Sequence, residues 1–252
     1  MVPDRNLAPP SILLLALEGR AWIELAALIP SLPSLLAGTP RGDGHPVLVI
    51  PGYLASDRST RALRAFLRQR GYHVHAWRLG LNLGPSPRIV AGLDARLREL
   101  RVRHGRTVSL VGWSLGGIYA RELARRMPAD VRQVITLASP FRDPSASNVA
   151  RLLGRRRRAD PGDLAEQLRE PLPVPTTSIL SRSDGIVAWR SCLEEEGPRR
   201  ENVVVESSHC GMGHHAAALA VIADRLAQPE GTWRPFTSWG VGPWRAQRLT
   251  TR

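Results

Sequence analysis

Short apolar runs alternate with longer amphipathic stretches along the chain from residue 45 onward. The short runs are rich in valine, isoleucine and leucine, which predicts buried strands, and apolar positions three and four apart in the longer stretches predict helices. Strands separated by helices indicate an α/β fold, a mostly parallel central sheet with helices on both faces. We expect strands over residues 46–50, 72–77, 107–112, 131–138, 176–180 and 202–207, and helices over 59–71, 88–104, 117–127 and 214–228.

A different pattern precedes this alternation, because residues 11–28 place apolar side chains around most of a helix circumference. Pro30 and Pro33 follow and are expected to end that helix. Two interpretations stay open: the helix covers a flank of the main domain, or it lies on a lipid surface. We favour packing, because surface-binding helices are rich in basic residues and the charged residues of this one are Glu18, Arg20 and Glu24.

These patterns divide the chain into three regions. Residues 1–44 form an apolar helical extension, and residues 45–230 form the main α/β domain. Within it, residues 141–172 are rich in arginine, proline and aspartate and are long enough for a small lid over the strand ends. Residues 231–252 form a tail without a clear period, expected to be held on the domain by Trp233, Trp239 and Trp244.

At 252 residues and 43% hydrophobic content, the chain suits one substantial folded domain. It holds 35 basic and 22 acidic residues, a formal net charge of +13, and every basic residue is arginine. A field of this sign attracts anionic partners such as phospholipid surfaces and acidic carriers. We expect the densest cluster, Arg155 to Arg158, to be a solvated loop and not a nucleic-acid site, because no zinc-ligand spacing, RNA-binding aromatic motif or recognition helix lies beside it.

Cysteine use and targeting patterns bear on the compartment. Cys192 and Cys210 form no metal-ligand spacing. No secretory signal is evident, since Asp4 precedes the apolar region and charges interrupt it, and no apolar run reaches the ~20 residues that a membrane-spanning helix needs. We therefore expect a cytoplasmic protein with reduced thiols and no bound metal, and peripheral contact with a membrane stays open.

The stretch GWSLG, residues 112–116, contains the serine with the clearest chemical pattern. A predicted strand runs into Gly112 and a predicted helix follows Gly116, so Ser114 lies on a sharp turn between them. Only small neighbours let strand and helix pass this closely, and the serine backbone is expected to be strained. The hydroxyl then projects at the carboxyl end of the sheet, above a helix N-terminus, as a nucleophile requires.

A nucleophilic serine needs a base and an orienting carboxylate, and candidates for both follow predicted strands. Asp184 comes just after the strand over 176–180, and His209 comes just after the strand over 202–207. Because parallel strands deliver their carboxyl ends to one edge of a sheet, Ser114, Asp184 and His209 are expected to form a catalytic triad there. Weaker rivals, none of them at a strand exit, are the bases His214 and His215 and the acids Asp143 and Asp163.

Acyl transfer also needs two donors for the negative oxygen that develops during attack. The backbone N–H of Leu115, directly after the serine, is the first expected donor. The second is the N–H of Tyr53 in the loop IPGYL after the first strand, where Gly52 gives a substrate room to approach the backbone.

With these motifs, the sequence resembles the α/β-hydrolase superfamily, and within it the bacterial lipase and esterase branch. VLVIPGYLASD is similar to its oxyanion loop, with Pro51 where a histidine is often found, and LVGWSLGGIYARELA is similar to its nucleophile elbow. VITLASPF, SRSDGIV and SSHCGM are similar to the following strand, the acid loop and the histidine loop. The resemblance covers about residues 45–228. It implies an α/β-hydrolase fold and a serine hydrolase of carboxylic esters that uses no cofactor.

The sequence therefore predicts an enzyme that cleaves an ester with an apolar acyl group through an acyl-serine intermediate. Two alternatives stay open. An acyltransferase would use the same triad but pass the acyl group to an acceptor other than water. A non-catalytic lipid- or partner-binding protein would use the scaffold without the chemistry.

Overall fold

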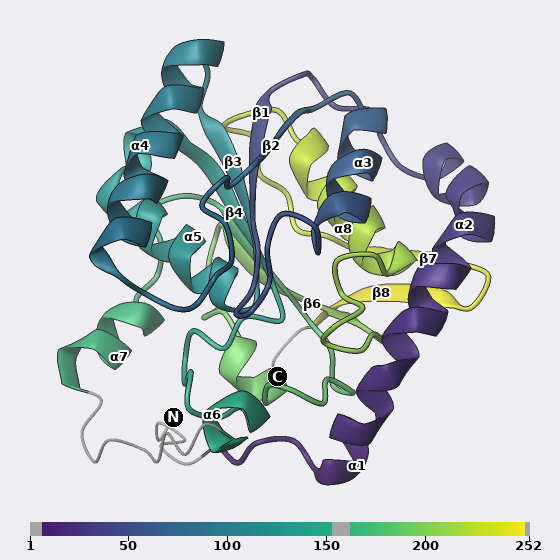
Figure 1. Cartoon of the computed structure of the whole chain (residues 1–252). Helices are drawn as coiled ribbons and strands as arrows, with labels where there is room; N and C mark the ends of the chain where they lie inside the picture. The colour runs from purple at the N-terminus through teal and green to yellow at the C-terminus, as the bar shows by residue number, and fades with distance from the viewer. Residues whose placement is uncertain (1–6, 153–161, 250–252) are drawn as a thin grey trace.

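A central eight-stranded sheet organises the computed structural model, which describes residues 7–152 and 162–249 (Figure 1). The strands are β1 (Pro46–Ile50), β2 (His73–Ala76), β3 (Val108–Trp113), β4 (Val131–Leu137), β5 (Thr176–Leu180), β6 (Arg200–Val205), β7 (Ser238–Val241) and β8 (Trp244–Leu249). Their order in the sheet is β2-β1-β3-β4-β5-β6-β8-β7, and β1 to β6 run parallel. All six predicted strands are confirmed, each within about two residues at its ends.

Helices cover both faces of this sheet, as the sequence predicts (Figure 1). The main ones are α3 (Arg61–Gln69), α4 (Pro87–His104), α5 (Leu115–Arg126) and α8 (Ala216–Ala227), and short 3-10 helices are η2 (Pro128–Asp130) and η3 (Trp189–Cys192). Successive residues of β1 enter different cores. Val47 and Val49 pack with α3 and α8, whereas Leu48 and Ile50 pack with α4 and α5. A strand buried on both sides gives the unbroken apolar run seen in the sequence.

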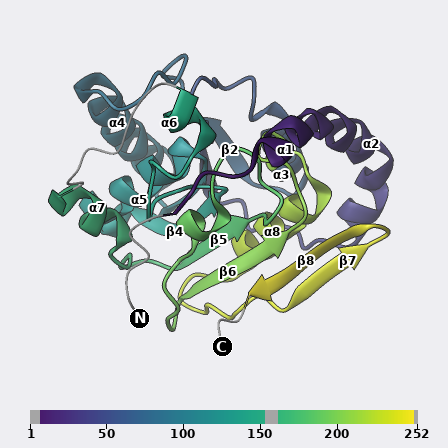
Figure 2. The ribbon, with the colours of Figure 1, turned by 90° about the horizontal axis from the view of Figure 1, so that it is seen from below.

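The C-terminal residues extend the sheet. β8 pairs antiparallel with β6, and β7 pairs antiparallel with β8, so the hairpin lies beside β6 at the edge of the sheet (Figure 2). The sequence predicts a tail held on the domain over residues 231–252 but gives no sign of these two strands. Both strands are short and only Ala246 is buried, so they show no clear apolar period. Trp239 and Trp244 pack against the core that contains α8.

Residues 11–37, called the N-terminal segment below, form a broken helix along one flank of the domain. It consists of α1 (Ile12–Ala16), the 3-10 helix η1 (Leu17–Arg20) and α2 (Ala21–Ala37). The prediction that Pro30 and Pro33 end the helix is wrong, because α2 continues through both. Both prolines are exposed. Because proline has no N–H, the carbonyl groups of Ala26 and Ile29, two residues that are also exposed, lose their helical partners. None of the helices described has the length and hydropathy of a membrane span.

The expected lid region over residues 141–172 is described in part. It carries α6 (Asn148–Leu152) and α7 (Gly162–Arg169), whereas Arg155 to Arg158 lie outside the described residues. Phe141 and Leu168 pack with Ile118 of α5 in a small third core. The region thus rests on α5, the helix that follows Ser114.

Candidate active site

Ser114 lies on the sharp turn between β3 and α5, at the carboxyl edge of the sheet. Its backbone has φ 53° and ψ -122°, a conformation that costs a non-glycine residue about 1–3 kcal/mol. Its N–H donates to the Leu137 carbonyl and its own carbonyl accepts from the Ser139 hydroxyl, each over 2.7 Å. Residues at the end of β4 therefore hold the strained turn, and the expected strand-to-helix elbow is confirmed.

Close packing around this turn requires glycine. A Cβ at Gly112 would collide with the backbone of Gly116, and a Cβ at Gly116 would collide with the Ile50 carbonyl. A Cβ at Gly52 would lie 3.1 Å from the Ser114 Cβ and 3.8 Å from its Oγ. The loop after β1 therefore lies directly against the serine.

The structure brings Asp184 and His209 into direct contact. Oδ2 of Asp184 lies 2.7 Å from Nδ1 of His209, and both residues are buried. Oδ1 of the same carboxylate accepts hydrogen bonds from the N–H groups of Ile186 and Val187, each over 2.8 Å. This arrangement assigns the imidazole proton to Nδ1 and leaves Nε2 as the basic nitrogen.

Ser114 and His209 lie at the same edge of the sheet, after β3 and β6, without a hydrogen bond between their side chains. Such contacts are often long in the free state of an enzyme and shorten when substrate binds. The structure thus joins two members of the expected triad directly and places the third on the same edge.

The pKa of His209 is raised above its ordinary value. Burial on its own lowers this pKa, but the Asp184 carboxylate raises it through its charge and its hydrogen bond, and the charge of Glu18 raises it further. Both carboxylates therefore stabilise the imidazolium that forms when the histidine accepts a proton.

The loop over residues 51–55, called the oxyanion loop below, carries the expected donor Tyr53. In the described structure, neither the Tyr53 amide nor the Leu115 amide donates a hydrogen bond, so both are available to a substrate oxygen. The Leu115 amide also opens α5, where the helix dipole favours negative charge.

Asn82 holds the oxyanion loop, a role that its place in a turn-rich stretch does not reveal. Its fully buried side chain donates from Nδ2 to the Pro51 carbonyl over 3.0 Å, and its backbone carbonyl accepts from the Leu54 N–H over 2.8 Å. The Tyr119 hydroxyl of α5 donates to Oδ1 of Asn82 over 3.3 Å. Because Leu54 has a positive φ of 55°, these bonds stabilise a strained loop.

The N-terminal segment contributes two further buried carboxylates, to which the sequence patterns assign no role. Glu18 is 9% exposed and Glu24 is 7% exposed. They lie against the acid loop, residues 181–187, and the histidine loop, residues 206–215. The presence of charges on an otherwise apolar helix was the available signal, since a buried carboxylate must find donors.

The rival candidates make other contacts. His214 and His215 lead into α8 as predicted, and Nε2 of His214 lies 3.0 Å from the Ala21 carbonyl. Asp143 accepts two hydrogen bonds within its own turn. The side chain of Asp163 lies outside the described residues.

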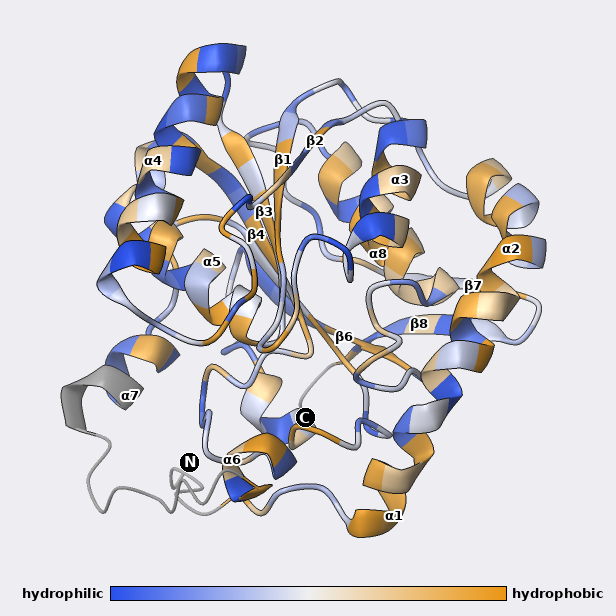
Figure 3. Cartoon of the chain, viewed as in Figure 1, coloured by the Kyte–Doolittle hydropathy of each residue, from blue (hydrophilic) through white to orange (hydrophobic). Residues whose placement is uncertain are grey.

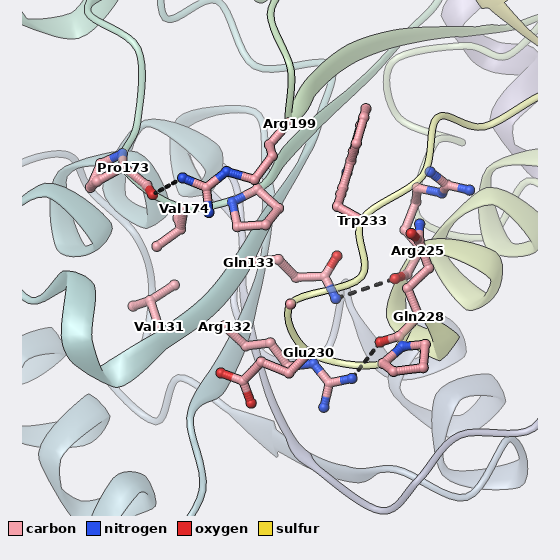
Figure 4. A pocket seen from close by; sticks show the side chains of 13 residues that line it. Val131, Arg132, Gln133, Pro173, Val174, Arg199, Arg225, Gln228, Glu230 and Trp233 are labelled. Carbon is pink, nitrogen blue, oxygen red and sulfur yellow. Dashed lines mark hydrogen bonds between the residues drawn. The ribbon is translucent and has the colours of Figure 1, made fainter.

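A pocket at the opposite edge of the sheet is separate from this site (Figure 4). It is lined by Val131, where β4 begins, and by Arg199, which precedes β6. Its arginines already have partners, because Arg132 bonds to the Asp43 carboxylate over 2.9 Å and Arg199 donates to the Pro173 carbonyl over 3.0 Å. The pocket therefore adds nothing to the chemistry at the carboxyl edge.

Both cysteines are free thiols, Cys192 buried and Cys210 exposed. Burial raises the pKa of the Cys192 thiol well above its ordinary value, which keeps it protonated. Within the residues that the structure describes, no group of three or more histidine, cysteine, aspartate or glutamate side chains is arranged to hold a metal ion.

A mostly parallel sheet, a strained serine between β3 and α5 and a later aspartate–histidine pair together define the α/β-hydrolase class of folds. A family model described as the alpha/beta hydrolase family matches residues 47–251. The chain belongs to this family, as its motifs suggested.

Solved structures of lipases and other hydrolases share the fold. The mature form of the Bacillus licheniformis lipase BlEst2 has a TM-score of 0.55 at 19% identity, covering 75% of this chain and 94% of that one. An alpha/beta superfamily hydrolase from Oenococcus oeni PSU-1 has a TM-score of 0.56 at 15% identity, covering 73% and 91%. A monoacylglycerol lipase from Paleococcus ferrophilus has a TM-score of 0.52 at 15% identity, covering 73% and 96%. No curated protein matches the chain significantly.

Proposed function

We propose that the protein hydrolyses carboxylic esters through an acyl intermediate on Ser114. The observation that carries this proposal is the buried contact between Asp184 and His209 at the sheet edge where the strained serine lies. Membership of the alpha/beta hydrolase family and the fold shared with lipases support the same chemistry.

In the proposed reaction, Nε2 of His209 takes the hydroxyl proton of Ser114 as Oγ attacks the ester carbonyl carbon. Asp184 keeps the imidazole oriented and stabilises the imidazolium. The imidazolium then gives its proton to the leaving alcohol, which departs and leaves an acyl-serine. A water molecule, deprotonated by the same histidine, then attacks the acyl carbon. The bond to Oγ breaks, the carboxylic acid leaves, and the imidazolium returns its proton to Oγ of Ser114.

During both attacks the carbonyl oxygen becomes negatively charged. We assign its stabilisation to the N–H groups of Tyr53 and Leu115, which have no other acceptor within the described residues. Fixed donors of this kind are effective because they need no reorganisation as the charge develops.

The surroundings of the oxyanion loop favour an apolar acyl group. Leu54 in this loop is 60% exposed, and Leu81 and Leu83, on either side of Asn82, are 52% and 65% exposed. Because Asn82 bonds to the loop that touches Ser114, Leu81 and Leu83 lie beside that loop. An apolar substrate chain would cover side chains that otherwise contact water.

Fluorophosphonate labelling followed by peptide mapping tests the nucleophile in the intact chain. We expect the label on Ser114, and in Ser114→Ala we expect no label and hydrolysis of p-nitrophenyl esters reduced by at least about 10³-fold. Ser59→Ala, at an exposed serine before α3, is the matched control and should keep both the label on Ser114 and the native rate of ester hydrolysis. Labelling of another residue, or none, contradicts the proposal.

Two further results would identify the alternatives. An acyltransferase would transfer the acyl group to an added alcohol or thiol faster than to water, and analysis of the reaction products in the presence of the added alcohol or thiol detects this. A non-catalytic binding protein would show no covalent labelling of Ser114.

A further inference from the structure

Glu18 of the N-terminal segment bridges the acid loop and the histidine loop. Its Oε1 accepts hydrogen bonds from the N–H groups of Gly185 over 2.8 Å and His209 over 2.9 Å, and its Oε2 accepts from the Cys210 N–H over 2.9 Å. Gly185 directly follows Asp184 in the chain. One carboxylate therefore holds the backbone beside both the proposed base and its orienting acid.

The other charged residues of the segment contact the same two loops. Glu24 accepts hydrogen bonds from the N–H of Ser208 over 2.9 Å and from its hydroxyl over 2.6 Å. Arg20 donates to the carbonyl and the hydroxyl of Ser183, each over 2.8 Å. Arg20 also donates to Glu24 over 3.3 Å, so these contacts form a connected network.

The backbone of both loops lies tightly against the segment. A Cβ at Gly185 would collide with the Leu14 carbonyl, and a Cβ at Gly211 would collide with the Glu24 carboxylate. The segment and the two loops therefore pack as one unit.

We propose that Glu18 is a positioning residue, whose carboxylate fixes the acid loop relative to the histidine loop and places negative charge beside the imidazole of His209. This inference rests on the proposed ester hydrolysis. Hydrogen bonds from amides to a carboxylate are charge-assisted and stronger than bonds to a neutral oxygen. A glutamine at this position would lose the charge and one of the two acceptor oxygens.

The charge of Glu18 has a measurable effect on the proposed base. Asp184 contacts the His209 ring, and Glu18 accepts from the His209 N–H. The other titratable groups of the packed loops and segment bond elsewhere: Glu24 to Ser208, Arg20 to Ser183, and His214 to Ala21, while Cys210 follows His209 in the chain. Asp184 raises the pKa of His209 most and Glu18 adds to it. Removal of the Glu18 charge should therefore lower this pKa and move the acid limb of the activity profile to lower pH.

Glu18→Gln in the full chain tests the role, with Glu99→Gln as the matched control because Glu99 is a half-exposed carboxylate paired with Arg96 on α4. For Glu18→Gln we expect kcat on p-nitrophenyl esters to fall by about 10- to 100-fold with little change in KM. NMR titration of the His209 ring should show a lower pKa in Glu18→Gln and no change in Glu99→Gln. The aspartate of Glu18→Asp keeps the charge but is too short to reach both loops. This variant should therefore keep part of the raised pKa of His209, while its kcat falls.

These measurements separate failure of the inference from failure of the proposed function. If fluorophosphonate does not label Ser114 in the native chain, ester hydrolysis is wrong, and the NMR titration still reports the effect of Glu18. If Glu18→Gln keeps the labelling rate and the pKa of His209, the positioning role is rejected. If Glu18→Gln does not fold, an unchanged kcat in Glu18→Asp also rejects the positioning role of Glu18.

The outer face of the N-terminal segment supports a second inference from different observations. Ile12, Leu13, Trp22, Ile23 and Ile29 are exposed by 69%, 72%, 77%, 71% and 72%. Orange, hydrophobic residues accordingly run along α1 and α2 at the edge of the molecule (Figure 3). The charged residues of the segment, Glu18, Arg20 and Glu24, all contact the acid loop or the histidine loop, so the outer face carries no charge. Large apolar side chains exposed in this number along one segment are typical of an interaction site.

Charge decides between the occupants of this face. A second copy of the chain would bring a formal charge of +13 against the same charge. Beside the segment, the exposed Arg182 and Arg190 lie over the Trp189 ring, with 5.3 and 4.6 Å from guanidinium carbon to ring centroid, and they share a surface pocket with Leu14. Guanidinium groups next to apolar side chains fit an anionic lipid surface, which offers phosphates and acyl chains together.

We propose that the outer face of the N-terminal segment docks the protein on an anionic lipid surface. Sedimentation with vesicles of phosphatidylglycerol and phosphatidylcholine, against vesicles of phosphatidylcholine alone, tests this with the full chain. We expect tighter binding to the anionic vesicles, weakened by salt. The double variant Trp22→Ser with Ile29→Ser should bind about tenfold or more weakly, because two large apolar side chains no longer enter the lipid.

Val102→Ser is the matched control, since Val102 is 83% exposed on α4, on the other side of the molecule (Figure 1). Its vesicle binding should equal that of the native chain. Binding that the double variant retains, or absence of binding to both kinds of vesicle, rejects lipid docking. A dimer in analytical ultracentrifugation that the double variant breaks would assign the face to a second copy instead.

Discussion

The indole N–H of Trp113 donates a hydrogen bond to the carbonyl oxygen of His209 over 3.1 Å. Trp113 is the last residue of β3, directly before Ser114. A Cβ at Gly213 would collide with the Trp113 ring, so the histidine loop also packs against the indole. This side chain joins the nucleophile turn to the backbone of the proposed base, although the serine and histidine side chains are not hydrogen-bonded to each other.

Trp113→Phe keeps much of this packing and removes the hydrogen bond. Because such a bond contributes about 0.5–1.5 kcal/mol, we expect kcat to fall by about 3- to 10-fold while KM stays within about twofold. Steady-state kinetics on a p-nitrophenyl ester measure both values, and circular dichroism confirms the fold. A change in KM alone would show that Trp113 acts in substrate binding instead.

Gly52→Ala should lose mainly activity, whereas Gly116→Ala should lose mainly stability. The new Cβ at Gly52 would lie 3.1 Å from the Ser114 Cβ and 3.3 Å from the Trp113 carbonyl, crowding the site, so we expect kcat/KM to fall by about 10²-fold with little loss of stability. At Gly116 the Cβ would collide with the Ile50 carbonyl and push β1 away from α5, lowering the unfolding free energy by about 3 kcal/mol. Ester hydrolysis and urea unfolding of both variants test this contrast, and equal stability losses would contradict it.

The pH dependence of kcat/KM should reflect the raised pKa of His209. The neutral imidazole is the form that accepts the serine proton, so activity should rise with pH through this pKa, with a midpoint above the ordinary value of 6.5. Asp184→Asn removes the largest stabilising charge and should lower kcat by about 10⁴-fold. If the acid limb of the kcat/KM profile of the native chain has its midpoint below 6.5, the raised pKa of His209 is contradicted.

Arg121 and Glu194 form an ion pair in which both side chains are fully buried behind the nucleophile helix. Arg121 also donates to the Glu170 carbonyl over 3.0 Å. Arg121→Met leaves the Glu194 carboxylate buried without its partner, so we expect a loss of about 3–5 kcal/mol of unfolding free energy. The double variant with Glu194→Met should recover much of this loss, and urea unfolding of both variants measures it. A double variant no more stable than the single one would contradict this account.

Stability should fall in mild acid because of His45. Burial first, and the charge of Arg132 second, lower the pKa of His45 from 6.5 to about 4 in the folded protein. The unfolded chain then binds the proton more tightly, so the unfolding free energy falls as pH drops from 6.5 to 4, by up to about 3 kcal/mol. Urea unfolding at several pH values across this range gives the unfolding free energy at each pH. In His45→Gln this free energy should fall less steeply with decreasing pH than in the native chain, and an equally steep fall would contradict the assignment to His45.

The sequence predicts that Ser114, Asp184 and His209 lie at one edge of the sheet because each of them follows a strand. Ser114, Asp184 and His209 come after three largely buried strands, and parallel strands bring their carboxyl ends to one edge. The backbone strain at Ser114 was also expected, because GWSLG places glycine where strand and helix approach most closely.

Other parts of the structure depend on contacts that leave no local pattern. Glu18 meets the histidine loop across 191 residues of sequence, and Asn82 meets Pro51 across 31. Neither lone polar residue reveals its partner. The course of α2 through Pro30 and Pro33 depends on which side of the helix faces water, and that side is set only when the segment packs.

The contact between Glu18 and the histidine loop also orders events in folding. The ribosome makes the N-terminal segment long before β6 and the histidine loop, so Glu18 and Glu24 have no amide donors to bind while most of the chain is still being synthesised. Contacts between such distant residues form late, because the intervening chain must first close into a loop. We therefore expect the strained serine turn to fold with the sheet, and the proposed activity to appear only after Glu18 has bound the histidine loop.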